Sequence, residues 1–215
     1  MPAKSRTAYF TKRGKHFGNL WAVYSTKMNQ VIRLGSDRQL AHWLLYLEFS
    51  CDVISFQFNP TFKSVNSDSL NRLDYHVEVN RRVGMVELHY LRVAGRSENY
   101  AEKLRAAEKM KYSYIEFSDE DWTPKKGKLL SLLRLANFLS GGRNTYIPVG
   151  LDQTAMDYVR YSRKGTLQSF LSALSSYNRN LSLLAFCRMY STCLIDVDFD
   201  SNIFSKDTLW WVYEP

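Results

Sequence analysis

Two acidic residues lie in apolar, alternating stretches of the sequence, where an ionised carboxylate needs a partner. Asp74 lies near the start of one such stretch (residues 73–79), and Glu87 lies within the next (residues 85–93). Removing a charge from water costs free energy unless it binds a cation or hydrogen-bond donors. A hard divalent cation such as Mg²⁺ is held by carboxylates, backbone carbonyls and water. The pair is therefore a candidate metal site, although acids also alternate with apolar residues in ordinary half-exposed sheets.

The stretches around these acids are expected to be strands. Residues 53–58, 73–79 and 85–93 are rich in β-branched and aromatic side chains with an alternating pattern. The sequence Asn-Arg-Arg-Val-Gly at residues 80–84 predicts a hairpin turn between the last two. Because adjacent antiparallel strands joined by a tight turn run side by side, Asp74 and Glu87 could reach the same face or end of a sheet.

The rest of the pattern up to residue 122 completes an α/β unit. Apolar residues recur at helical spacing between Ser36, which is suited to cap a helix, and Glu48. A second helix is expected at residues 97–110, and a further strand at residues 112–117. We therefore expect residues 1–122 to form an α/β domain around a mixed sheet, preceded by a basic N-terminal arm.

A polar segment at residues 119–128 marks the expected domain boundary, because it joins an acidic cluster, Pro124 and a lysine-rich turn. Beyond it, apolar residues recur at helical spacing in four segments, at residues 128–139, 152–161, 166–175 and 181–189. Two strand-like runs follow, at residues 193–199 and 208–213. Helices followed by such a hairpin predict a mainly helical, winged-helix-like domain at residues 123–215.

The composition is that of a basic, globular protein. The 215 residues are 45% hydrophobic, and 29 Lys and Arg against 21 Asp and Glu give a formal charge of +8, which favours polyanions such as nucleic acid. The apolar run at residues 129–139 is interrupted by Arg134 and is too short to span a bilayer. The polar N-terminus is not a secretory signal. We expect a cytoplasmic protein without membrane attachment, and reduced core cysteines at Cys51, Cys187 and Cys193.

Two groups of basic residues are candidates for contact with DNA. They are Lys12, Arg13 and Lys15 in the N-terminal arm, and Arg160, Arg163 and Lys164 before the helix expected at residues 166–175. The arm could contact phosphates or could simply keep the chain soluble. In a winged helix-turn-helix the second group would clamp the DNA backbone, but such units are also used for protein contacts alone.

Several short phrases occur along the chain in a suggestive order. They are Ser36-Asp-Arg-Gln39, Leu47-Glu-Phe-Ser-Cys-Asp-Val53, Gln57-Phe-Asn-Pro60, Asp74, Glu87-Leu-His89, Leu194-Ile-Asp-Val-Asp198 and Phe204-Ser-Lys-Asp-Thr208. Together with the order helix, strand, hairpin, helix and strand, they resemble the PD-(D/E)xK nuclease core, which implies a restriction-endonuclease-like fold for residues 1–122. More narrowly, they resemble TnsA, the endonuclease subunit of heteromeric cut-and-paste transposases. The similarity extends from about residue 13 to residue 212.

This resemblance implies a metal-dependent DNA endonuclease that cuts the 5′ ends of transposon DNA. It implies an integrase-type transposase subunit as protein partner, and it allows a regulatory ATPase as a further one. It assigns Asp74, Glu87 and the carbonyl of Leu88 to Mg²⁺ or Mn²⁺, Gln39 to completion of the metal shell, and His89 to positioning of the attacking water.

Two positions depart from the family pattern. Gln39 replaces a glutamate, so it can ligate through its amide oxygen but cannot neutralise a cation. His89 replaces a lysine, and a histidine is a poorer fixed cation near pH 7. Lys103, on the next expected helix, could replace the missing charge or could be one of many exposed helix lysines.

Two functions therefore remain open. One is an active TnsA-like endonuclease subunit, and the other is a catalytically inactive nuclease-fold subunit that binds DNA or assembles the complex. An ordinary winged-helix transcription factor would account only for the C-terminal half.

Overall fold

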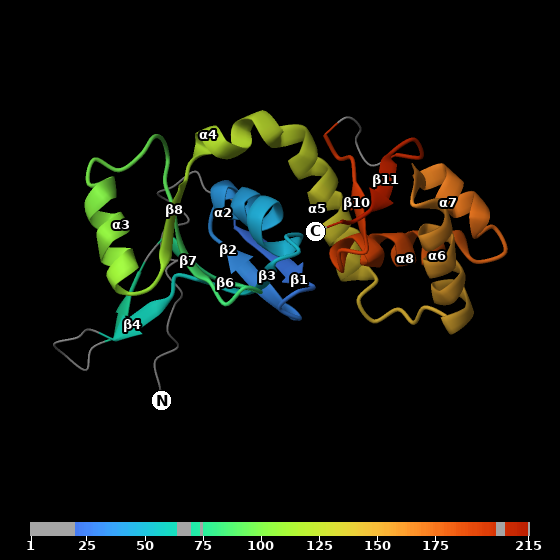
Figure 1. Cartoon of the computed structure of the whole chain (residues 1–215), viewed down its shortest axis with the longest axis horizontal. Helices are drawn as coiled ribbons and strands as arrows, with labels where there is room; N and C mark the ends of the chain where they lie inside the picture. The colour runs from blue at the N-terminus through green and yellow to red at the C-terminus, as the bar shows by residue number, and fades with distance from the viewer. Residues whose placement is uncertain (1–19, 64–69, 74, 201–204, 215) are drawn as a thin grey trace.

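The computed structural model describes residues 20–63, 70–73, 75–200 and 205–214. Its largest sheet has four strands, in the order β3 (Val53–Phe58), β6 (His76–Arg81), β7 (Val86–Leu91) and β8 (Ser113–Phe117). Helices lie before this sheet, after it, and between its last two strands (Figure 1). The expected α/β class is thus confirmed.

The register of the four-stranded sheet explains where the candidate residues lie. β3, β6 and β7 are antiparallel neighbours, so that Val79 is opposite Phe56 on one side and Glu87 on the other. The expected hairpin turn is present between β6 and β7, with Gly84 at a φ of 75°, where a side chain would be strained. β8 runs parallel to β7 after the crossover helix α3 (Tyr100–Lys109).

The two faces of this sheet are covered differently. One face packs against α2 (Asp37–His42) and the π-helical turn η1 (Trp43–Glu48), which bury Trp43 and Leu47 in the main core. The other face packs against α3 through a small separate cluster around Leu88. Successive side chains of a strand point to opposite faces, so Glu87 and His89 share the α2 face while Leu88 faces α3.

A hairpin that the sequence did not lead us to expect precedes α2. It consists of β1 (Trp21–Ser25) and β2 (Gln30–Leu34). Glu48, which is 2% exposed at the end of η1, fixes its turn. The Glu48 carboxylate accepts hydrogen bonds from Ser25 Oγ (2.5 Å), Thr26 N (2.6 Å) and Trp43 Nε1 (3.0 Å). A second short hairpin joins β4 (Thr61–Lys63) to β5 (Leu70–Arg72).

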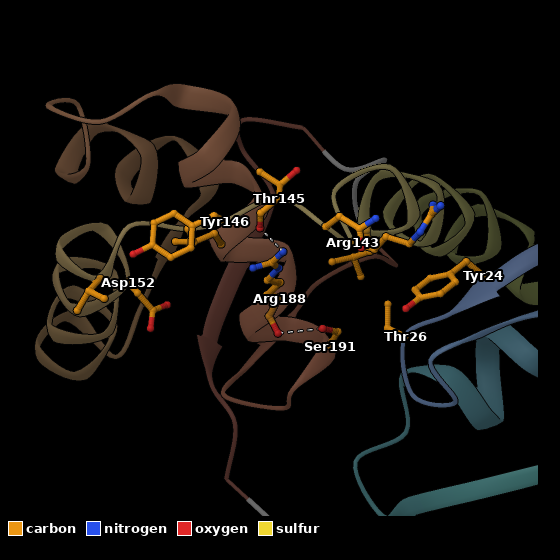
Figure 2. A pocket seen from close by; sticks show the side chains of 12 residues that line it. Tyr24, Thr26, Arg143, Thr145, Tyr146, Asp152, Arg188 and Ser191 are labelled. Atoms are coloured by element: carbon orange, nitrogen blue, oxygen red, sulfur yellow. Dashed lines mark hydrogen bonds between the residues drawn. The ribbon is translucent and has the colours of Figure 1, made fainter.

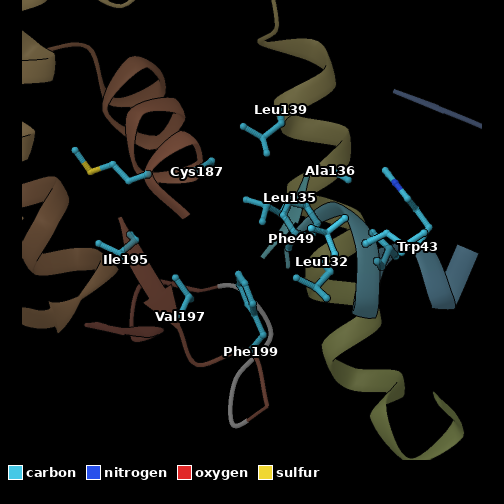
Figure 3. Close-up of a cluster of buried hydrophobic side chains, with 14 of the residues drawn as sticks. Trp43, Phe49, Leu132, Leu135, Ala136, Leu139, Cys187, Ile195, Val197 and Phe199 are labelled. Atoms are coloured by element: carbon cyan, nitrogen blue, oxygen red, sulfur yellow. The ribbon is translucent and has the colours of Figure 1, made fainter. Parts of the chain in front are cut away.

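The segment at the expected domain boundary is helical. It forms α4 (Asp119–Trp122), the 3₁₀ turn η2 (Thr123–Lys125) and the start of α5 (Lys126–Gly141). Pro124 fits the first turn of η2, where no backbone donor is needed. One hydrophobic core continues across α5, from Trp43 in η1 to Val197 in β10 (Figure 3). The division of the chain at residues 122 and 123 stays a prediction.

The C-terminal part combines helices with a small sheet. Its elements are α6 (Val149–Ser162), β9 (Lys164–Thr166), α7 (Leu167–Ala173), α8 (Arg179–Ser191), β10 (Ile195–Val197) and β11 (Leu209–Val212). The strands pair in the order β10-β11-β9, so the last strand lies between the other two. No helix in the described part of the chain has the length and apolar character needed to cross a bilayer.

The expectation of three reduced cysteines was wrong for two of them. Cys51 and Cys193 form a disulfide with their Cα atoms 5.7 Å apart, although 142 residues separate them in sequence. The fold brings the end of η1 next to the end of α8, a proximity that no local pattern reveals. Cys187 is free and buried as expected, and burial raises the pKa of its thiol.

Candidate functional site

Glu87 and His89 lie next to each other on the α2 face of β7. Both are buried: Glu87 is 6% exposed and His89 is 1% exposed. Val79 and Val77, their neighbours across β6, are fully buried, so this part of the face belongs to the interior. The strand period thus places the two side chains together, as the sequence led us to expect, but it places them under α2 and away from solvent.

The Glu87 carboxylate is engaged by two donors. Its Oε2 atom lies 2.7 Å from Arg81 Nη2 and 2.8 Å from His89 Nε2. Arg81 also binds Asp52 Oδ2 through Nη1. Burial by itself would raise the pKa of Glu87, but the hydrogen bonds from His89 and Arg81 outweigh it, so the pKa lies below its ordinary value. The ionised form of Glu87 is therefore already neutralised within the fold.

His89 uses both of its ring nitrogens. Nε2 faces ionised Glu87, which can only accept, so Nε2 must be protonated and donate. The other nitrogen, Nδ1, lies 2.8 Å from Nε2 of His42 on α2. Which of the two rings donates in this hydrogen bond depends on their tautomers.

His42 ends this chain of hydrogen bonds. It is fully buried and stacks on Tyr46 with ring centroids 5.7 Å apart, while Phe117 meets it edge-on at 5.0 Å. Burial, and next the neighbouring His89, lower the pKa of His42 well below its ordinary value. Its Nδ1 atom is buried without a hydrogen-bond partner. His42 is therefore neutral near pH 7.

Gln39 does not join this network through its amide oxygen. Its Oε1 accepts a hydrogen bond from the backbone N of Gly35 at 2.5 Å, and the residue is 5% exposed. The amide therefore secures the turn that leads into α2. Leu88, whose carbonyl was the expected third ligand, lies between β6 and β8 with its side chain on the α3 face.

Asp74 lies outside the described residues. His76, two residues further along the chain, opens β6 opposite Tyr90 and stacks on that ring at 4.6 Å, which places it on the α3 face of the sheet. Lys103 is on this face too, with Nζ 4.3 Å from the centre of the Tyr90 ring and 2.9 Å from Ser97 Oγ. The sheet separates Lys103 from Glu87, so it cannot supply the charge that His89 lacks.

A divalent cation does not fit the described part of this site as it is arranged. The described residues contain no group of three or more His, Cys, Asp and Glu side chains that could hold a metal ion. The guanidinium of Arg81 occupies the place beside Glu87 that a cation would take. Because Asp74 lies outside the described residues, the Mg²⁺ or Mn²⁺ site stays a prediction.

The expected DNA-contacting residues fall into two classes. Lys12, Arg13 and Lys15 lie outside the described residues. Arg160 and Arg163 end α6 with exposed side chains, and Lys164 begins β9. Each arginine has an acid beside it: Arg163 pairs with Glu214, and Arg160 lies 3.9 Å from Asp157. Contact of these residues with DNA stays a prediction.

Arg81, His42 and Asp52 are the members of the site that the sequence did not reveal. Arg81 is the last residue of β6, the strand opposite Glu87. This position was the one sequence feature that could have indicated a contact between Arg81 and Glu87. A scan against protein-family models and a search of curated proteins found no match.

Proposed function

We propose that this protein is a catalytically inactive, nuclease-fold subunit that binds DNA and helps to assemble a transposition complex. The observation that carries the proposal is the closed hydrogen-bond chain from Arg81 through Glu87 and His89 to His42. The active site of a metal-dependent nuclease needs a carboxylate that is free to hold a cation and a basic group that is free to act on water. Here both groups are buried and bonded to the protein itself.

The order of elements supports a nuclease-like scaffold. A helix, three antiparallel strands, a crossover helix and a parallel strand follow one another, which is the order on which the resemblance to TnsA rests. The C-terminal part agrees with a winged-helix interpretation, because a helix and a strand are followed by two helices and a hairpin whose last strand is central. The inactive scaffold would thus keep its shape for assembly.

The packing of α8 favours a role in assembly of the complex over insertion of this helix into the major groove of DNA. In a DNA-binding helix-turn-helix unit the second helix presents a free face to the major groove. The four consecutive residues 184–187 are all buried, and four residues cover a full helical turn. Arg188 is also engaged, with Nη2 donating to the carbonyls of Gly142 and Thr145 at 3.0 and 2.8 Å. Only the first turn of α8 has strongly exposed side chains.

The test combines DNA binding with cleavage. Anisotropy of a labelled duplex should report binding in the absence of any divalent cation. Incubation of the protein with a transposon-end duplex, Mn²⁺ and an integrase-type transposase should leave the 5′ ends uncut. Cleavage that is lost in Glu87→Gln but kept in the exposed control Glu108→Ala would overturn the proposal, as would absence of DNA binding.

An active endonuclease is the second candidate. It is favoured by the position of Glu87 and His89 on the third strand of the meander, where the resemblance expects metal-binding and water-positioning residues. Activity would require Glu87 to exchange Arg81 for the cation. Calorimetric titration of Mn²⁺ separates the candidates: saturable binding that is abolished by Asp74→Ala supports the endonuclease, whereas no binding, even with duplex DNA present, supports the inactive subunit.

A further inference from the structure

The stretch from residue 123 to residue 151 has an unusual charge distribution. It contains Lys125, Lys126, Lys128, Arg134 and Arg143 and no acidic residue. In the whole chain, by comparison, 21 acids accompany 29 basic residues. A concentration of one sign of charge on a single element creates a local positive potential that attracts polyanions.

The cations of this stretch project from the exposed side of α5. Leu132, Leu135 and Leu139 form its buried side and lie in the core. Lys126, Leu130, Arg134, Asn137 and Phe138 are exposed and fall on the opposite side at a spacing of three, four or eight residues. We call these five residues, with Lys125, the outer face of α5. Because the inner side is locked into the core, the direction of this face is fixed.

The cations of the outer face do not form ion pairs with acidic residues of the described chain. The side chain of Arg134 makes no hydrogen bond or ion pair with the rest of the described chain. Lys125 Nζ lies 5.6 Å from the Tyr46 ring centre, and Lys126 Nζ lies 6.0 Å from that of Trp122. Lys128 differs, since its Nζ is 3.5 Å from Asp200, and we leave it out of the face.

Arg143, the last cation of the stretch, is not part of the outer face, because it borders a cavity that Leu139 of the buried side also lines. Arg143 lies just beyond α5 with its guanidinium carbon 5.4 Å from the Tyr24 ring centre. It borders a cavity of about 660 Å³, shown in Figure 2, which Arg188 and Tyr146 also line. Tyr146 is 73% exposed at this rim. Asp152 is the acidic residue among the lining side chains.

We propose that the outer face of α5 is a binding surface for the phosphate backbone of duplex DNA. Lys126 and Arg134 lie on the same side of α5 and are about 12 Å apart along its axis, so that they can contact separate phosphates of one strand. Charge complementarity selects this partner, because the face offers cations without acids and a duplex offers a continuous row of anions. The inference rests on the proposed DNA-binding function and names a surface for it that differs from the arm and from Arg160, Arg163 and Lys164.

The experiment compares two double variants with the same change in net charge. Lys126→Ala/Arg134→Ala removes two cations of the outer face. Arg105→Ala/Lys109→Ala removes two exposed cations of α3, where Glu102 and Glu108 are close in sequence. Affinity for a random-sequence duplex is measured by anisotropy over a series of salt concentrations, because each lost phosphate contact lowers the slope of log affinity against log salt by about one.

We expect the α5 variant to bind at least tenfold more weakly at low salt, with a slope smaller by about two, and the α3 variant to bind nearly as the parent chain does. Equal losses in both variants would mean that net charge alone acts, and this would overturn the inference. Unchanged binding in the α5 variant would overturn it too, while leaving the proposed function in place. A parent chain that binds no duplex would overturn both. Circular dichroism and thermal melting verify that the variants are folded.

Discussion

The site around Glu87 and the outer face of α5 are opposite kinds of polar region. At Glu87 the buried carboxylate meets partners from the same chain: Arg81 on one side and His89 on the other. On α5, Arg134 is exposed and meets no partner among the described residues. The first region is complete without a ligand, and the second is not.

This difference indicates which of the two regions is available to bind a partner molecule. A buried ion pair costs desolvation and repays it only through good geometry and further hydrogen bonds, so it signals structure as often as function. An exposed cation on a rigid helix contributes little to stability, and its hydrogen-bonding capacity is available to a ligand. Glu87 and His89, the residues that most suggest a catalytic site in the sequence, are thus the ones whose polar atoms are bonded to other residues of the fold.

The largest effect is expected from the disulfide between Cys51 and Cys193. Replacing Cys51 and Cys193 by serine should lower the free energy of unfolding by about 4 kcal/mol, because the unfolded chain loses a constraint on a very long loop. Urea titration of the double variant, beside the parent chain with and without a dithiol reductant, measures this. If reductant does not shift the parent chain and the double variant matches it, the cross-link does not form.

Replacing Glu87 should destabilise the protein by disrupting the hydrogen bonds of the site around it. Glu87→Ala leaves buried His89 without its acceptor and removes one of the two anions of Arg81, which keeps Asp52, so it should cost about 2 kcal/mol of unfolding free energy. Denaturant titration provides the value, and Glu108→Ala on the surface of α3 is the matched control. A more stable Glu87→Ala variant would contradict the comparison, because removal of a strained catalytic acid tends to stabilise a protein.

The buried histidine should make the first region sensitive to acid. The pKa of His42 is lowered in the fold, so below about pH 6.5 the unfolded chain binds a proton that the folded chain does not. Stability contributed by neutral His42 is therefore complete above that pH and declines as the pH falls toward the folded pKa. The groups facing His42 are the rings of His89 and Tyr46.

His42→Gln tests this dependence, since glutamine can still hydrogen-bond to His89 but cannot be protonated. Melting temperatures between pH 8 and pH 5 should fall less steeply in the variant. Loss of the Glu87 charge acts at lower pH, below about 4.5, so the two contributions are separable. Parallel curves for variant and parent would show that His42 does not titrate between the folded and unfolded states.

The smallest effect on stability is expected in the second region. Arg134→Ala should change the unfolding free energy by less than about 0.5 kcal/mol, because an exposed side chain without partners stabilises little. Urea titration checks this beside the DNA-binding measurement. A loss of 1 kcal/mol or more would mean that Arg134 does have a partner within the chain.

Local patterns predicted most elements but not their assembly. Alternation at residues 53–58 and 85–93 predicted β3 and β7, and helical spacing predicted α5 and α8, because these periods reflect burial of one face. The hairpin of β1 and β2 went unnoticed, since its turn depends on Glu48, more than 20 residues away. Strand period placed Glu87 beside His89, but their partners Arg81 and His42 come from other elements.

The dependence of the first hairpin on Glu48 also bears on the order of folding. Two strands alone are marginal in water, and here the turn is completed only when a carboxylate from the end of η1 arrives. The hairpin and the helical segment should therefore form in a single cooperative step. In native-state hydrogen exchange, the amides of Thr26 and Leu47 would then share one opening free energy, and a nascent chain that ends before Glu48 would leave residues 21–34 without their structure.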